Sequence, residues 1–343
     1  MGRFIDWLLE LLISRPLPNV IIENPRYINF SNDYIAPVPG KADDTWLYCF
    51  PIKGQYAKMQ TLIDQRLNFT SLNEKKKFFP LSDYMILVIS DIRKGYSINP
   101  SDTKYGFLTE KALQIFIPIM ECNKNEKNEW IAQRILVHIP YIFVDQPFNI
   151  GTGREEFGFP KSLANIVMPS TPDHADFFQV DAYGFKNYNK ENPEYGGFHT
   201  LLEIKSINKE IPKGQWTKHQ EAWAHVKQFL PHREIPLQWG ISFLINELKD
   251  LAERAIPMVF LKQFRDIQIP TNACYQAITE GNGTVNEFFG GWLLHSEYEI
   301  TIHDLASFPM AEELGLEKNI TVKHTFWTHC NLQFNTGNLL WKA

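Results

Sequence analysis

The feature of this sequence that most limits its fold is a long succession of short apolar segments bounded by Pro or Gly. Segments such as 84–92 (YMILVISDI) and 133–144 (QRILVHIPYIFV) are rich in β-branched and aromatic residues, which favours strands. Beyond the N-terminal stretch, helical spacing of apolar residues is confined to 55–68, 215–230 and 237–255. Strands and helices therefore do not alternate regularly, which argues against a doubly wound parallel sheet. The pattern predicts an α+β protein made mainly of antiparallel strands that close into a barrel.

The expected organisation is one domain with an extended arm before it. Residues 1–44 are rich in Pro, Asn and Asp and predict an N-terminal arm wrapped over the core, whereas 45–343 form the domain. The two long helical stretches predict a helical insert at about 213–256. Residues 150–154, where two glycines follow an apolar segment, predict a turn. Strands are expected at 45–54, 84–92, 113–120, 133–144, 174–185, 196–207, 257–267, 273–282, 297–305 and 319–334.

Charge and cysteine usage exclude several classes of protein. The net charge of -5 gives no indication of the basic surface that nucleic-acid binding requires. Four cysteines without a CxxC pair indicate reduced thiols in a cytoplasmic protein. The apolar N-terminus is interrupted by Asp6 and Glu10 and is too short to span a bilayer, so we expect an amphipathic helix and no membrane contact. No spacing typical of metal ligands or of a phosphate loop is present, and we expect no metal and no cofactor.

One segment, IGTGREEFGFPKSLANIVMP at 150–169, stands apart because it places Lys161 among many apolar side chains. Burying an ammonium group is costly, so such a lysine usually pairs with a carboxylate or loses its charge. In the first case Glu155 or Glu156 would be the partner, in a purely structural turn. In the second case the neutral amine could attack a ketone, and the protonated imine would act as an electron sink. The residues alone leave both interpretations open.

The segment GREEFGFPKSLA resembles the GRE…PK signature of the acetoacetate decarboxylase family. In that family the lysine after Pro forms a Schiff base with the substrate, which implies that Lys161 is the nucleophile. Arg154 and Glu155 match the GRE element, and the resemblance implies an ion pair that braces the turn before the lysine. FLTEKALQIFIPI at 107–119 is similar to another family stretch, and the match implies that Glu110 orients the substrate or moves protons.

The resemblance covers most of 45–343 and implies a closed, double-layered β cone. Phe157 and Phe159, next to the lysine, are then expected to contact the substrate. The carboxylate of the substrate needs a cation to bind it. The candidates are Arg265 and Lys262 on the strand expected at 258–269. Family members generally assemble, so a homo-oligomer is expected.

The sequence also departs from the family pattern. A second lysine follows the nucleophile in the decarboxylase proper, whereas Ser162 stands there in this chain. A neighbouring charge is one way to activate a lysine amine, and desolvation is another. Activation of Lys161 must therefore come from its apolar surroundings. The arginine with which the family holds the substrate carboxylate near its first strand has no match either; Trp46 falls close to that position.

These observations predict a lyase that decarboxylates a small 3-oxo acid through an imine on Lys161. Two alternatives remain open. An aldolase-dehydratase would use the same lysine on a pyruvate-like 2-oxo acid, because the imine can tautomerise to an enamine that attacks an aldehyde. A non-catalytic barrel would bind an apolar ligand and form no imine.

Overall fold

The computed structural model describes residues 27, 37–210, 212–229, 256–295 and 297–343. By its internal contacts the chain divides into two units, 1–34 and 35–343, and every element described below belongs to the second. The predicted N-terminal helix, most of the predicted arm and the predicted helix at 237–255 lie outside the described residues.

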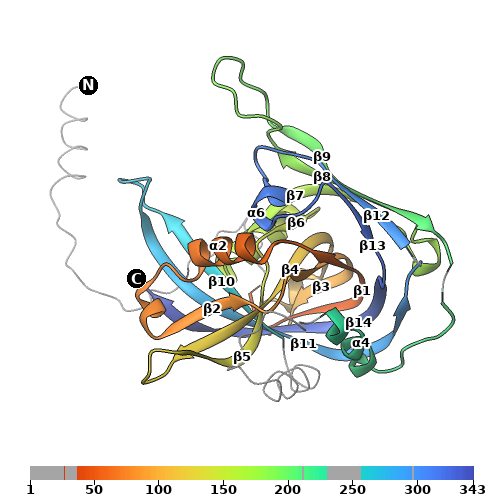
Figure 1. The fold of residues 1–343 in the computed structure, drawn as a ribbon, viewed down its shortest axis with the longest axis horizontal. Coiled ribbons are helices and arrows are strands. Elements are labelled where there is room, and N and C mark those ends of the chain that lie inside the picture. Colours follow the sequence, from red (N-terminus) through yellow and green to blue (C-terminus); the bar gives the residue numbers. More distant parts are fainter. Residues whose placement is uncertain (1–26, 28–36, 211, 230–255, 296) are drawn as a thin grey trace. The chain divides into compact units, whose positions relative to one another are not determined.

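The second unit is mainly β, with a few short helices (Figure 1). The helices are α2 (Tyr56–Arg66), α3 (Pro147–Glu156), α4 (His219–Val226) and α6 (Met310–Leu314), with 3-10 turns at Ser71–Glu74, Thr103–Tyr105, Pro172–His174 and Lys227–Phe229. The strands are β1 (Gly40–Lys53), β2 (Lys76–Pro80), β3 (Tyr84–Ser97), β4 (Leu108–Lys124), β5 (Trp130–His138), β6 (Ile142–Val144), β7 (Lys161–Val167), β8 (Phe177–Gly184), β9 (Gly197–Asn208), β10 (Ile256–Arg265), β11 (Ala273–Leu293), β12 (Glu297–Ile302), β13 (Asn319–Val322) and β14 (Phe326–Lys342). Among the described residues, no helix combines the length and the apolar character that crossing a membrane requires.

Seven strands close into a hydrogen-bonded ring. The order is β4, β3, β1, β14, β11, β10 and β5, and β5 pairs again with β4. All these pairings are antiparallel except the one between β10 and β5, where Met258 lies opposite Val137. The prediction of a closed, largely antiparallel barrel is therefore confirmed for this ring.

The remaining strands branch from the ring and pack against its outer face. β4 also pairs with β6, and the order then continues through β7, β8, β9, β12 and β13. Successive side chains of a strand point to opposite faces, so Tyr48 and Phe50 of β1 contact the branch while Leu47 faces the ring interior. The ring of Tyr48 lies 5.2 Å from that of Phe178, and the ring of Phe50 lies 5.3 Å from that of Tyr298. This aromatic core fixes β7 beside the ring.

Several predicted elements differ from those observed. The segment predicted as one strand at 133–144 is split around Pro140, which lacks a backbone donor for the ladder. The segment predicted as one strand at 319–334 is also two strands, with His324 at a positive φ of 61° between them. The helix predicted at 215–230 is only α4 and a 3-10 turn, because Trp216 pairs with Gly291 as an isolated β-bridge. Of the predicted insert at about 213–256, the described residues include 213–229 and 256.

A buried ion network ties β2, β4, β5 and β11 together. Arg134 donates to Glu121 at 2.7 Å and to Glu280 at 2.5 Å, and Lys76 lies 2.5 Å from the other oxygen of Glu121. Only 5% of the Glu121 side chain and 4% of the Glu280 side chain are exposed. Both carboxylates thus depend on protein donors in place of water.

We expect Arg134→Met to lower the free energy of unfolding by about 3 kcal/mol, because it leaves two buried carboxylates without their shared cation. Equilibrium urea unfolding measures the change. The matched control is Lys205→Met, which removes an exposed ion pair with Glu203 and should cost less than about 1 kcal/mol. Equal losses of unfolding free energy in the two variants would show that the buried network contributes no more to stability than an exposed ion pair does.

Candidate active site

The residues before Lys161 form a helix and a tight turn rather than the predicted glycine turn. α3 starts with Pro147 in its first turn, where the missing N–H costs nothing. The helix ends at Glu156 with Phe157 as its C-cap, and Gly158 follows in the left-handed region with φ +79°. A Cβ at Gly158 would lie 2.7 Å from the backbone of Lys262, so a side chain is excluded there. The turn delivers Lys161 as the first residue of β7, opposite Ile142 of β6.

Lys161 is held against Glu110 of β4. Its Nζ donates to Oε2 of Glu110 at 2.7 Å, and the exposed fractions of the two side chains are 12% and 7%. The carboxylate partner considered from sequence was Glu155 or Glu156, and the structure places Glu110 there instead. The nearby Asp145 accepts the backbone N–H of Lys111 at 2.8 Å, and burial raises the pKa of Asp145. The site thus combines an amine with a carboxylate that can exchange a proton with it.

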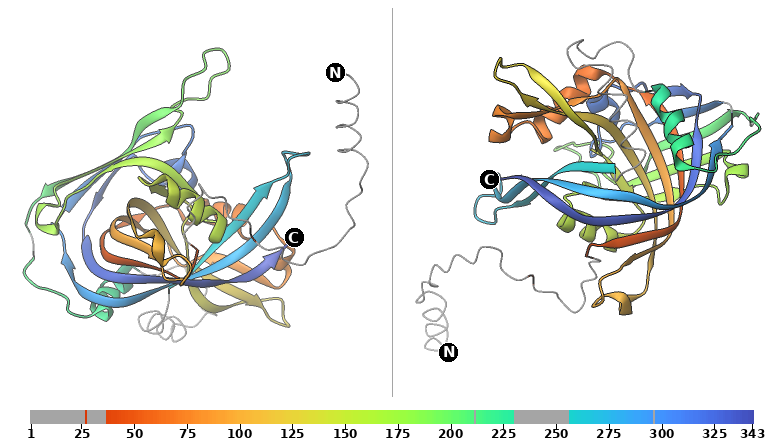
Figure 2. Two further views of the ribbon diagram at one scale, coloured as in Figure 1. Left: turned by 180° about the vertical axis from the view of Figure 1, so that it is seen from behind. Right: turned by 90° about the horizontal axis from the view of Figure 1, so that it is seen from below.

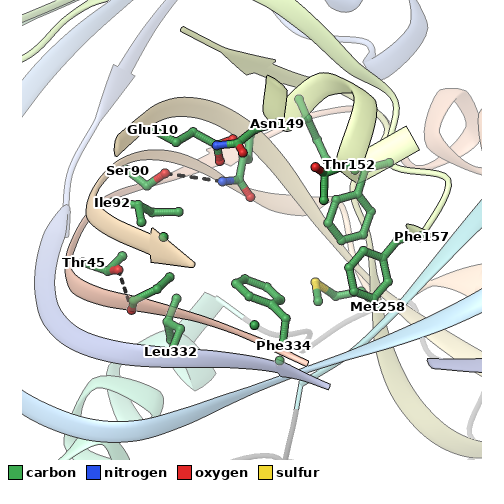
Figure 3. Close-up of a pocket in the computed structure, with 18 of the residues that line it drawn as sticks. Thr45, Ser90, Ile92, Glu110, Asn149, Thr152, Phe157, Met258, Leu332 and Phe334 are labelled. Carbon is green, nitrogen blue, oxygen red and sulfur yellow. Dashed lines mark hydrogen bonds between the residues drawn. The ribbon is translucent and has the colours of Figure 1, made fainter. Parts of the chain in front are cut away.

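The pair lies in the wall of a cavity of about 260 Å³ inside the ring. More than half of the lining residues are apolar, and they include Phe157 and Phe159, the two residues expected to contact the substrate. The rings of these two phenylalanines stack with centroids 4.6 Å apart. Figure 3 shows Glu110, Asn149 and Thr152 on one side of this space and Leu332 and Phe334 across from them.

Polar groups that the sequence reasoning missed also line the cavity. Asn149 and Thr152 come from α3, and Gln114 of β4 donates to the hydroxyl of Ser90 at 3.4 Å. Asn149, Thr152 and Gly153 are spaced i, i+3, i+4, which is the signature of one helix face. Had the segment been interpreted as a helix, this spacing would have indicated that Asn149 and Thr152 lie on the same face as Gly153.

The turn is braced by contacts other than the expected ion pair. Arg154 is exposed, Glu155 is half-buried, and among the described residues the structure records no ion pair between them. Instead the hydroxyl of Thr279 donates to the carbonyl of Phe157 at 2.6 Å. The backbone N–H of Phe159 also donates to the carbonyl of Gly153 at 3.0 Å.

The two cations suggested for a substrate carboxylate do not line the cavity. Arg265 is exposed and donates to the carbonyl of Pro270, beyond the ring on the hairpin of β10 and β11 that projects in cyan in Figure 2. Lys262 donates to the carbonyl of Glu156 at 3.3 Å, and burial lowers its pKa. The structure therefore gives no support for substrate binding by Arg265 or Lys262.

Trp46 does not line the cavity either. Its ring stacks on His329 with centroids 4.1 Å apart, on the face of β1 opposite to Thr45 and Leu47. Among the described lining residues, the cations are Lys161 and Lys41.

Gly153 provides the space that the Lys161 side chain occupies. A Cβ at Gly153 would lie 2.8 Å from Cδ and 3.0 Å from Cε of Lys161. We expect Gly153→Ala to push the Lys161 side chain away from Glu110 and so to lower the free energy of unfolding. The loss of this buried ion pair outweighs the better helix propensity of Ala, which is worth about 1 kcal/mol. Equilibrium urea unfolding measures the change.

Gly151→Ala is the matched control, because it lies in the same helix and a Cβ there meets nothing within 4 Å. It should gain up to about 1 kcal/mol of stability. An equal gain in the two variants would contradict the role given to Gly153.

No protein-family profile matches the sequence, and a comparison with curated proteins finds no match. Solved structures do match. Acetoacetate decarboxylase from Legionella pneumophila is 13% identical with a TM-score of 0.54, covering 98% of this chain and 96% of that one. A second acetoacetate decarboxylase structure is 10% identical with a TM-score of 0.53, covering 95% and 96%.

The enduracididine biosynthesis enzyme MppR, complexed with the condensation product of pyruvate and imidazole 4-carboxaldehyde, is 13% identical with a TM-score of 0.50, covering 89% and 90%. At such identities the similarity concerns the fold. The matches span nearly the whole length of these proteins. This chain has the acetoacetate decarboxylase-like fold.

Proposed function

We propose that this protein is a lyase that decarboxylates a 3-oxo acid through a Schiff base on Lys161. The observation that carries the proposal is the 2.7 Å contact between Nζ of Lys161 and Glu110 in a largely apolar cavity. An amine that is to attack a carbonyl must first lose a proton, and a carboxylate in hydrogen-bond contact can accept it. The fold shared with acetoacetate decarboxylase supports the same chemistry.

The reaction starts when a proton moves from Nζ of Lys161 to Glu110 and the free amine attacks the oxo carbon. Glu110 gives its proton to the hydroxyl of the carbinolamine, which leaves as water, and a protonated imine forms. The bond between the substrate's C2 and its carboxylate carbon then breaks, CO2 leaves, and the bonding electron pair moves into the imine to give an enamine. Glu110 takes up a second proton from water and passes it to the enamine carbon, and water hydrolyses the resulting protonated imine to a ketone and Lys161 in its ammonium form.

The surroundings of Lys161 serve this sequence in two ways. Phe157 and Phe159 keep bulk water away from the imine, which would otherwise hydrolyse before the carboxylate leaves. Asn149 and Thr152 lie on the same side of the cavity as Glu110, where they can hydrogen-bond to the oxygen of the carbinolamine (Figure 3). These roles belong to the proposal.

A second outcome uses the same lysine. The structure of MppR with a condensation product shows that a protein of this fold holds a compound formed from pyruvate and an aldehyde. In that alternative the imine of a 2-oxo acid loses a proton to give an enamine, the enamine adds to an aldehyde, and water is then lost. Glu110 would move the protons.

Measurement of CO2 release separates these outcomes. We expect the protein to release CO2 from 3-oxo acids, starting with acetoacetate, above the spontaneous rate. Pyruvate mixed with an aldehyde tests the alternative, in which a condensation product accumulates and no CO2 is released. A protein that does neither with a panel of oxo acids would be a binding barrel without catalysis.

A further inference from the structure

We infer that the ligand of this cavity is an oxo acid or ketone with an extended apolar chain, alkyl or aryl, on the far side of the carbonyl from its carboxylate. The inference deepens the proposed function and rests on it for the identity of the reacting carbon. Its basis is the shape, size and lining of the space beyond Lys161.

The cavity is polar at one end and apolar at the other. Lys161 and Glu110 approach from β7 and β4, whereas Leu332 and Phe334 belong to β14. In the seven-strand ring, β14 is three strands from β4 in one direction and four in the other, so it lies opposite. Figure 3 shows the same arrangement, with Leu332 and Phe334 across the space from Glu110. A ligand whose carbonyl reaches Lys161 therefore directs its other end toward apolar side chains.

The residues around Phe334 leave room for such a chain. Gly40 of β1 and Gly283 of β11 lie opposite Phe334 in the two neighbouring strands, and both line the cavity. Met258 and Val285 add apolar side chains at this end, where Lys41 and Thr284 also line the cavity. A Cβ at Gly283 would lie 3.7 Å from the phenyl ring of Phe334, so a side chain there would fill space next to the ring, and its absence keeps that space open.

The size of the cavity exceeds what a four-carbon oxo acid needs. An apolar protein cavity of about 150 Å³ holds a benzene molecule. By proportion, the volume of about 260 Å³ accommodates on the order of ten non-hydrogen atoms. Acetoacetate would leave its methyl group facing unfilled apolar surface, whereas a longer alkyl chain or a phenyl group would cover that surface.

Binding of methyl ketones, the products of 3-oxo acid decarboxylation, tests this inference. The series runs from acetone through 2-pentanone and 2-heptanone to 2-nonanone and is titrated into a Lys161→Met protein, in which no imine forms. We expect each added methylene to tighten binding about threefold to fourfold until the apolar end is filled. An affinity that stays flat across the series would overturn the inference.

Gly283→Leu is the diagnostic variant, introduced beside Lys161→Met. A Cβ at Gly283 makes ordinary contacts, 3.5 Å from Met258 and 3.7 Å from Phe334, so the fold should tolerate it. The larger side chain should weaken 2-nonanone binding at least about tenfold, since it removes the equivalent of several methylenes of space. Gly197→Leu on β9, outside the cavity, is the matched control and should bind like its parent. Equal weakening in both variants would count against the inference.

The inference and the proposed function fail separately. Ketone affinity that rises with chain length, without CO2 release from any 3-oxo acid, would remove the catalytic proposal and support the apolar ligand class. CO2 release from acetoacetate, together with a ketone affinity that does not change with chain length, would support the catalytic proposal and remove the apolar ligand class.

Discussion

Lys161→Met should abolish CO2 release, with a loss in kcat/KM on the order of 10⁵-fold, a scale typical of removing a covalent nucleophile. Met keeps much of the length and the apolar stem of the lysine, so its packing beneath Gly153 is largely preserved. The loss is therefore expected without gross unfolding. Steady-state assays with acetoacetate and a longer 3-oxo acid measure it.

The control for this prediction is Lys205→Met, an exposed lysine of β9 paired with Glu203 outside the cavity. It should retain full activity. Urea midpoints of both variants separate a lost nucleophile from a lost fold. Substantial turnover by a well-folded Lys161→Met protein would exclude the imine.

Glu110→Gln should lower kcat by about 10²- to 10⁴-fold, the range for removal of a general acid-base group. The amide keeps the shape and a hydrogen-bond acceptor for Nζ of Lys161 but cannot take up its proton. We therefore expect kcat to fall while KM changes little. Pre-steady-state trapping of the imine measures which step becomes slow.

Glu110→Asp gives the complementary result. A carboxylate remains but is drawn back by one methylene, so activity should lie between that of the native protein and that of Glu110→Gln. If the Asp and Gln variants were equally impaired, Glu110 would act through its position in the wall and not through proton transfer.

The strands and a closed sheet were predictable from local signals, but the strand pairing that closes the ring was not. Each of β1 and β3 contains a continuous run of buried residues, which follows from the uninterrupted apolar and aromatic runs in their sequences. The ring closes through a single parallel contact of Met258 with Val137, which depends on how distant segments meet. Strand length was also underestimated: β11 runs for 21 residues, so Arg265 lies on a hairpin that extends past the cavity.

The candidate site was predictable to the extent that it lies in one contiguous segment. Lys161, Phe157 and Phe159 follow one another in the sequence, and the structure places all three at the cavity. Glu110 was indicated by the family resemblance alone, since it lies 51 residues away from Lys161. α3 was missed because its two glycines each lower helix propensity by about 1 kcal/mol. Packing outweighs this low helix propensity, because the Lys161 side chain occupies the space that a side chain at position 153 would need.

Reduction by borohydride in the presence of a 3-oxo acid tests the central claim most directly, since it converts a transient imine into a stable secondary amine. We predict a covalent mass increase that peptide mapping places on Lys161, and no increase when the substrate or the lysine is absent. A native, folded protein that gains no mass at Lys161 with any 3-oxo or 2-oxo acid would contradict the account.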